Sequence, residues 1–255
     1  MSSIGSIMNT AKQAFMTQQV AIEVTGTNVS NASSVGYSKQ RAVIVPVNSA
    51  EVAQNDIQGG VAVETVQRLY DQFIERQIIE QSAQLNYSET RHSALQQVEA
   101  IFNESQKDGL SSAMDRFWKA WDDLSVNPNG DVERLAVLSA ADNLAATFRD
   151  YAGQLSDLQG TLNTRIAGTV EQLDSYLAEI ATLNEKIIQT QSGGGNVNPL
   201  LDSRSELLKK VSEQVDIDYI EQSDGSLAIF LSNGKALVQG ATSWPLEAVR
   251  NLALK

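Results

Sequence analysis

The chain has 255 residues, of which 42% are hydrophobic and 20% charged, as in ordinary globular proteins. Its formal net charge of −12 argues against binding of nucleic acid or of an acidic membrane through a basic surface. It contains no cysteine, which excludes disulfides, thiolate nucleophiles and thiolate metal sites. No apolar run approaches the roughly 20 residues that a membrane-spanning helix needs.

The first thirty residues predict a helix with one narrow apolar stripe. A row with alternating spacings of four and three has eight positions there, and six are apolar: Ile4, Met8, Ala11, Phe15, Ile22 and Val29, with Gln18 and Thr25 at the other two. A stripe this narrow is not a core by itself, so we expect it to need a partner helix. The segment also lacks the charged start and continuous apolar run of a cleavable signal peptide. Export would therefore use a route that reads an uncleaved N-terminus.

A polar bend follows the helix. The stretch TNVSNASSVGYSKQ, residues 27–40, is rich in Asn, Ser and Gly, which bond to the backbone locally or favour left-handed geometry. We expect the helix to end and the chain to turn within residues 26–36. The runs QRAVIVPV and GGVAVETVQR then predict two strands separated by a polar loop. Pro46 keeps the first of them out of a central strand position.

Helical periodicity dominates the middle of the chain, first from about Val66 to Asn103. The strict apolar row that follows predicts the best-defined buried face, formed by Leu110, Met114, Phe117, Trp121 and Leu124. Residues 132–191 contain no proline and predict a helix of roughly 90 Å, in which three glycines are candidate break points. After SGGGN, Asn198 and Pro199 predict a cap and the first position of the next helix.

The period changes again near residue 215. VDIDYIE, LAIFL and KALVQG alternate like strands, and SDGS and SNG between them are typical of tight turns. The sequence therefore predicts a mainly α fold with a smaller β part. Three segments follow from it: a helix and bend (1–40), a long antiparallel helical bundle with a short hairpin near 41–65 (41–214), and the beginning of a β-rich domain (215–255).

Residues for acid–base or metal chemistry are scarce. His92 is the one histidine, and its place near the apolar row of its helix favours a core or interface role over catalysis. Asp216 and Asp218 share a strand face but have no evident third ligand, so a solvated face is the better interpretation. We expect no catalytic residue, no cofactor and no metal.

The polar bend resembles the Asn-rich, Gly-Tyr-ending motif of flagellar axial proteins, with Asn28, Asn31, Gly36, Tyr37 and Gln40 as its members. Three further stretches narrow the resemblance: VQRLYDQFIERQ, NPLLDSRSELLKKVSEQV and DGSLAIFLSNGKALVQG. Together they resemble the N-terminal portion of the hook-associated protein 1 family, junction proteins between flagellar hook and filament. The resemblance covers essentially all 255 residues in order.

This resemblance implies a structural subunit of the bacterial flagellum. Such a subunit leaves the cell through the type III export apparatus and self-associates in a ring-like tube segment. It has an inner assembly helix, a helical bundle and an outer β-rich domain. Its partners would be the hook protein, the second junction protein and an export chaperone. In the family the N-terminal helix pairs with a C-terminal one, so we expect this sequence to be a fragment or a truncated relative.

Two alternatives remain from the sequence. Another axial protein of rod or hook shares the bend, but those smaller proteins lack the long helix of 132–191 and the LLDSRSELL segment. A secreted helical binding protein or effector belongs to a different class, and the missing catalytic residues count against an enzymatic version of it.

Overall fold

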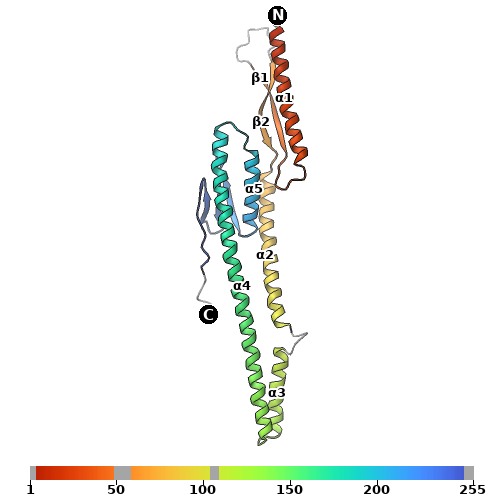
Figure 1. Ribbon diagram of the computed structural model, residues 1–255, viewed down its shortest axis with the longest axis vertical. Coiled ribbons are helices and arrows are strands. Elements are labelled where there is room, and N and C mark those ends of the chain that lie inside the picture. The colour runs from red at the N-terminus through yellow and green to blue at the C-terminus, as the bar shows by residue number, and fades with distance from the viewer. Residues whose placement is uncertain (1–3, 49–58, 104–108, 250–255) are drawn as a thin grey trace. The chain divides into compact units, whose positions relative to one another are not determined.

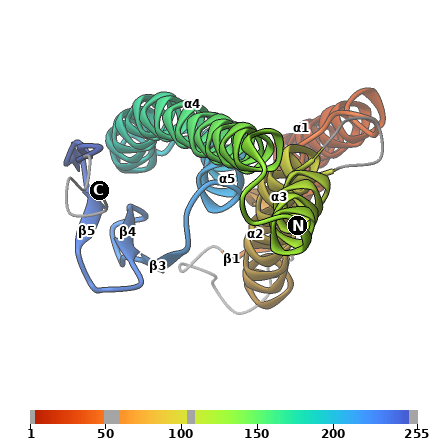
Figure 2. The same cartoon turned by 90° about the horizontal axis from the view of Figure 1, so that it is seen from below.

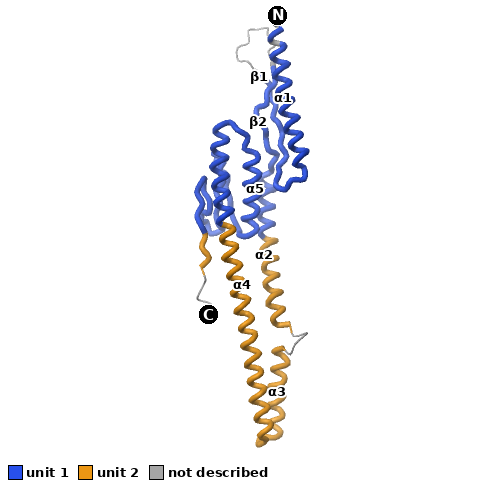
Figure 3. Tube along the Cα trace, in the orientation of Figure 1, with its two compact units in different colours: residues 1–83, 174–245 blue, residues 84–173, 246–255 orange. Residues whose placement is uncertain are grey.

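In the computed structural model, which describes residues 4–48, 59–103 and 109–249, five helices and six strands form two compact units. Unit 1 joins residues 1–83 to 174–245, and unit 2 joins 84–173 to 246–255 (Figure 3). Helices α2 and α4 contribute to both. Residues of all three segments predicted from the sequence occur in these two units. The division of the chain into three segments stays a prediction.

Unit 1 begins with helix α1 (Ile4–Ser30), which packs against a two-stranded antiparallel sheet of β1 (Gln40–Asn48) and β2 (Gly59–Arg68) (Figure 1). Helix α1 continues past Gly26 and ends at Ser30, within the predicted range of residues 26–36. The hydroxyls of Thr25 and Thr27 donate to carbonyls one turn earlier, at 2.8 and 2.9 Å. Both side chains therefore bond within the helix and do not compete with its backbone hydrogen bonds. Gly26 destabilises the helix by only about 1 kcal/mol relative to Ala.

The two predicted strands are present, and the loop predicted between them lies outside the described residues. Both strands are edge strands of a two-stranded sheet, and this position tolerates Pro46. Helix α2 (Gln72–Phe102) begins later than the predicted Val66, since residues 66–68 still pair with 40–42. Asp71 starts α2 instead, because its carboxylate accepts the backbone N–H groups of Phe73 and Ile74 at 3.0 and 3.3 Å.

Unit 2 contains the later part of α2, helix α3 (Leu110–Val126) and the first two thirds of α4 (Asp131–Ser192) (Figures 1 and 2). Helix α4 is one continuous helix of 62 residues, so the three candidate glycine breaks do not occur. Phe102 contacts Tyr151 across α2 and α4, with ring centroids 5.3 Å apart.

The best-buried face predicted for α3 is wrong. Its buried residues are Ala113 and Ala120. Of the predicted row, Leu110, Phe117 and Leu124 are half-buried, while Met114 and Trp121 are 40% and 47% exposed. Helix α3 lies beside α4 in both views (Figures 1 and 2). A helix that packs on a single neighbour has a narrow contact line, and small residues fill its centre while large ones flank it in solvent.

The main hydrophobic core lies in unit 1. Helix α5 (Asn198–Ser212) and the end of α4 lie beside a four-stranded antiparallel sheet of β3 (Ile217–Glu221), β4 (Leu227–Leu231), β5 (Ala236–Gln239) and β6 (Thr242–Ser243), in that order (Figures 1 and 2). Seven apolar side chains are almost completely buried there: Leu177, Ile180, Ile187, Val211, Ile229, Leu237 and Val238. The turns predicted at SDGS and SNG each place a glycine at positive φ, Gly225 at 83° and Gly234 at 81°.

The prediction of a mainly α fold with a smaller β part is confirmed. One local prediction fails: Asn198 is not the cap of α5, because the cap position is Val197 and Asn198 is already helical. Pro199 does stand in the first turn. Within the described part of the chain, no helix is both long enough and apolar enough to cross a membrane.

The burial pattern predicts where the stability of the chain is concentrated. Ile180→Ala removes a side chain that is 0% exposed, and we expect a loss of about 2–5 kcal/mol in the free energy of unfolding. Leu138→Ala, in the same helix but 63% exposed, should change it by about 0.5 kcal/mol or less. Chemical denaturation followed by circular dichroism measures both. Equal losses for the two variants would contradict this location of the core.

Candidate functional site

The predicted apolar stripe is an exposed face of α1. Its five large side chains are between 69% and 79% exposed, and its alanine is exposed as well; the stripe consists of Ile4, Met8, Ala11, Phe15, Ile22 and Val29. Ile7 and Met16 widen the same apolar surface. An apolar row this long in solvent is typical of a protein–protein interface.

The opposite face of α1 makes the contact with β1 and β2 (Figure 1). Its members are smaller than those of the stripe or polar: Ala14, Val20, Ala21 and Val24 are half-buried, and Thr17 is 4% exposed. The Thr17 hydroxyl donates to the carbonyl of Val61 at 2.9 Å. The sequence pattern found the apolar stripe but not this second face, because alanine and threonine carry no strong periodic signal.

Asn28 closes the polar bend. Its amide nitrogen donates to the Gln40 carbonyl at 2.8 Å, and its amide oxygen accepts the Gln40 backbone N–H at 2.8 Å. The same oxygen accepts the Tyr37 hydroxyl at 2.8 Å. One side chain thereby ties the last turn of α1 to the first residue of β1. Burial, together with the negative charge of Asp202, raises the pKa of Tyr37 above its ordinary value.

The other members of the motif have separate tasks. Gly36 has a φ of 81°, the left-handed conformation that favours glycine, and so makes the reversal. Asn31 is half-buried and bonds locally, to the Thr27 carbonyl at 3.0 Å and the Ser34 hydroxyl at 3.2 Å. The structure therefore gathers Asn28, Tyr37 and Gln40 at one point, while Asn31 completes the helix end.

Three residues that contact the bend were missed by sequence reasoning. Asp202 accepts the Ser38 backbone N–H at 3.2 Å, and the Arg68 Nε lies 2.9 Å from its other oxygen. Asn198 donates its amide to the Gln40 side chain at 3.3 Å. Asn198 and Asp202 are four residues apart and so share one helix face, which was a usable signal. Nothing in the sequence pairs them with a bend some 160 positions away.

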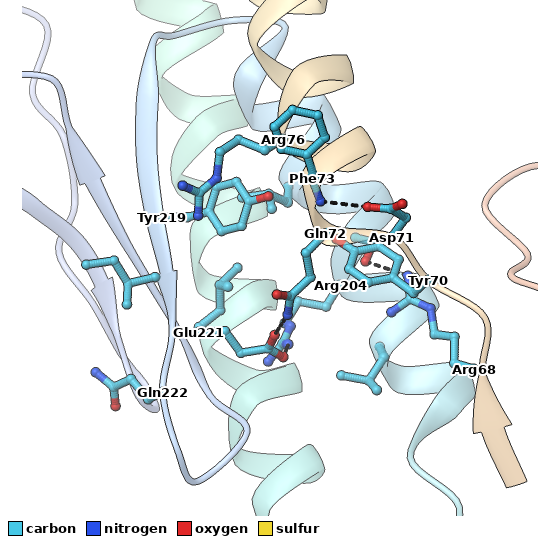
Figure 4. Close-up of a pocket in the computed structure, with 15 residues that line it drawn as sticks. Arg68, Tyr70, Asp71, Gln72, Phe73, Arg76, Arg204, Tyr219, Glu221 and Gln222 are labelled. Carbon is cyan, nitrogen blue, oxygen red and sulfur yellow. Dashed lines mark hydrogen bonds and ion pairs between the residues drawn. The ribbon is translucent and has the colours of Figure 1, made fainter.

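A cleft of about 1020 Å³ lies among β2, the start of α2, α5 and β3 (Figure 4). Its charged groups are paired with protein groups: Arg204 with Glu221 at 3.1 Å, and Gln72 with the same carboxylate at 2.8 Å. The guanidinium of Arg76 lies over the ring of Tyr219, 5.5 Å from its centroid. The lining residues include no histidine and no cysteine, and the carboxylate of Glu221 is already bonded to Arg204 and Gln72.

The remaining candidates for chemistry lie in solvent. His92 is exposed, so the expected core role is wrong, and the alternative interface role stays a prediction. The next two residues of α2, Ser93 and Ala94, are half-buried instead. Asp216 and Asp218 are exposed, in agreement with a solvated strand face. Among the residues that the structure describes, no cluster of three His, Cys, Asp or Glu could hold a metal ion.

Comparison with known proteins points to one family. The model of the family described as "Flagellar hook-associated protein FlgK helical domain" matches residues 95–253. Flagellar hook-associated protein 1 of Bacillus subtilis is 30% identical over 91% of this chain and 47% of its own length. The proteins of the same name from Escherichia coli and Salmonella typhimurium are each 28% identical over 98% of this chain.

The chain spans about half the length of these curated relatives: 47%, 46% and 45% of them. A solved structure is similar as well. The flagellar hook junction protein FlgK from Burkholderia pseudomallei matches with a TM-score of 0.52 and 28% identity. The match covers 64% of this chain and 30% of that one.

The geometry of the bend predicts unequal roles for its two asparagines. Asn28→Ala leaves three polar groups without their partner, and we expect a loss of about 1–3 kcal/mol together with faster amide exchange at Gln40. Asn31→Ala, whose bonds are local and exposed, is the control and should have a smaller effect. Denaturation and hydrogen exchange measure both effects, and a larger loss for the control would contradict the central role of Asn28.

The cleft generates a prediction in alkali. Burial, with a further contribution from Glu75, raises the pKa of Tyr70 to about 12 from its ordinary 10.0. The folded chain thus keeps a proton that the unfolded chain has lost, so this contribution to stability is present below pH 10.0 and is lost towards pH about 12. Tyr70→Phe should remove the last step of the tyrosinate absorbance titration. Tyr87→Phe, the control, should leave that step in place; the reverse result would overturn the assignment.

Proposed function

Because this chain belongs to the FlgK family of flagellar hook-associated proteins, we propose that it is a structural subunit of the junction between hook and filament in a bacterial flagellum. It associates with further copies of itself in a ring-like segment of the flagellar tube. It performs no catalysis and needs no cofactor. Its place is outside the cell, reached through the type III export apparatus without cleavage of a signal peptide.

The observation that carries this proposal is the direction of the apolar stripe on α1. A helix of a monomeric protein turns its large apolar side chains towards its own core. Here the hairpin of β1 and β2 covers the small and polar face, and Phe15 and Ile22 point away from it at 79% and 70% exposure. Such a helix is built to be covered by another chain or another helix of the assembled tube.

The magnitude supports assembly through several contacts. Burial of a large aliphatic or aromatic side chain contributes about 1.5–3 kcal/mol, so five such side chains contribute about 8–15 kcal/mol. Association costs an estimated 4–15 kcal/mol in lost translational and rotational freedom. One stripe contact is therefore marginal alone, and a closed ring, in which every subunit has two neighbours, makes it sufficient.

The proposed partners follow from the same position. The hook protein lies on one side of the junction and the second junction protein on the other, and an export chaperone covers the stripe before assembly. An exposed apolar helix in the cytoplasm would otherwise attract other chains. A chaperone of this kind should therefore bind residues of α1 and not the sheet of unit 1.

The experiment is deletion of the gene and complementation with a stripe variant. The deletion strain should carry hooks without filaments in electron micrographs. The intact gene should restore filaments, whereas substitution of Ile4, Met8, Phe15 and Ile22 by Ser should not. Because all four side chains are exposed, the melting temperature of the purified variant should stay within a few degrees of the unaltered protein.

The matched control replaces exposed polar residues outside the stripe row of the same helix by Ser, at Lys12, Gln19 and Glu23. This variant should restore filaments fully. Filaments in the deletion strain would overturn the junction role. A large fall in melting temperature for the stripe variant would instead place the stripe inside the fold of the monomer.

A further inference from the structure

Helix α5 holds the N-terminal arm, defined as α1, the bend, β1 and β2, by polar contacts at its first two turns. Asn198 donates its amide both to the Val66 carbonyl of β2, at 2.8 Å, and to the side chain of Gln40 at the start of β1. It therefore bridges the two strands at the open end of the hairpin, where β1 begins and β2 ends. Asn198 and Gln40 are 5% and 7% exposed, so this bridge is formed out of solvent.

Asp202 makes a second contact one turn later. One of its oxygens accepts the backbone N–H of Ser38 in the bend, and the other is paired with Arg68 at the end of β2. The Arg68 and Asp202 side chains are 10% and 11% exposed. The Arg68 guanidinium also donates to the Ser205 hydroxyl at 3.0 Å, and its planar group lies over the ring of Tyr70. The end of β2 is thus tied to α5 through an ion pair and a hydrogen bond, while Tyr70 stacks on the guanidinium from the same segment as Arg68.

Arg204 faces the other side of α5. Two residues correspond to a rotation of about 200° in an α-helix, so Asp202 and Arg204 point in nearly opposite directions. Arg204 donates to the side chain of Asn184 in α4 at 3.0 Å, to the Gly225 carbonyl at 2.6 Å and to Glu221. Asn184, which is 0% exposed, in turn donates to the carbonyl of Leu227 at 2.8 Å. These bonds attach α5 to α4 and to the sheet.

We infer that α5 is a clamp that sets the direction of the N-terminal arm relative to the sheet of unit 1, with Asn198 and Asp202 as its positioning residues. Hydrogen bonds and ion pairs require one relative geometry, whereas apolar surfaces can slide over one another. The groups are buried, so the clamp opens only if charged and polar atoms lose their partners together. The two stretches 27–40 and 198–215 are therefore the two halves of one joint.

The clamp gives the proposed assembly a defined geometry. An arm that rotates freely would lose rotational freedom when its stripe associates with a partner. A clamped arm has already lost that freedom in the folded chain, so association costs less. This consequence rests on the proposed function, but the clamp itself does not. The experiment that tests the clamp therefore uses the unassembled chain, so its result does not depend on the proposed role in the flagellum.

The test measures one distance distribution in the folded chain. The sequence contains no cysteine, so Lys12→Cys in α1 and Lys235→Cys in the turn between β4 and β5 give two unique spin-labelling sites. Both residues are exposed and belong to unit 1. Pulsed double electron–electron resonance should give one narrow distance distribution for the otherwise unaltered chain. The Asn198→Ala/Asp202→Asn double variant should at least double its width.

Two controls separate positioning from folding. Asp218→Asn removes an exposed carboxylate of the same unit and should leave the distribution narrow. Hydrogen exchange at Ile229, in the centre of the sheet, should be unchanged in the double variant, while the amides of Ser38 and Gln40 exchange at least tenfold faster. If the double variant loses its helical circular dichroism, Asn198→Ala alone decides, since it leaves the Arg68–Asp202 pair in place. An unchanged width in a folded variant, or a broad distribution in the unaltered chain, would overturn the clamp.

Discussion

A helix that packs on a two-stranded hairpin can bury only one of its faces, and α1 buries the face that is poor in large apolar groups. Thr17 and its alanine neighbours touch the hairpin, and Phe15 and Ile22 point into solvent. The small side chains allow the strands to come close to the helix. The large ones are then available for a contact that the described chain does not make by itself. The proposed role in assembly depends on this division of the helix surface.

Polar contacts join this helix and hairpin to α5. Placing Asn28, Asn198 and the Arg68–Asp202 pair out of solvent costs desolvation energy that apolar packing would not. What such contacts provide is a single relative geometry, because each hydrogen bond or ion pair forms only at a set distance between its two partners. The sheet, α5 and the end of α4 form an apolar core of their own next to this joint, so the polar contacts need not supply the stability of the unit.

The two units differ in how completely they bury their large apolar side chains. In unit 1, Leu177, Ile180 and Ile229 are almost fully buried. In unit 2, Trp118, Leu135 and others remain more than half exposed, although the helices that carry them are long and regular. A pair or trio of helices has too little interior to enclose large side chains. Membership of a family whose members assemble in the flagellum is compatible with both properties.

The sequence by itself determined the elements that depend on local chemistry. The helix stripe, the two hairpin strands, the left-handed Gly36 and the glycine turns of the sheet all follow from side-chain period and backbone preference, which act over a few residues. The exposure of the stripe could also be inferred, because so narrow a row cannot form a core.

Only the tertiary structure decided what depends on distant partners. Asn198 donates to Val66 of β2 and to Gln40 of the bend instead of capping its own helix, because these partners, distant in the sequence, supply the competing hydrogen bonds. The apolar row of α3 looked buried but is flanked by solvent, since a period shows which residues share a face and not what covers that face. The joint between residues 27–40 and 198–215 is invisible to any local pattern for the same reason. Its two halves have complementary hydrogen-bonding groups, and only the folded chain brings them within 3.3 Å.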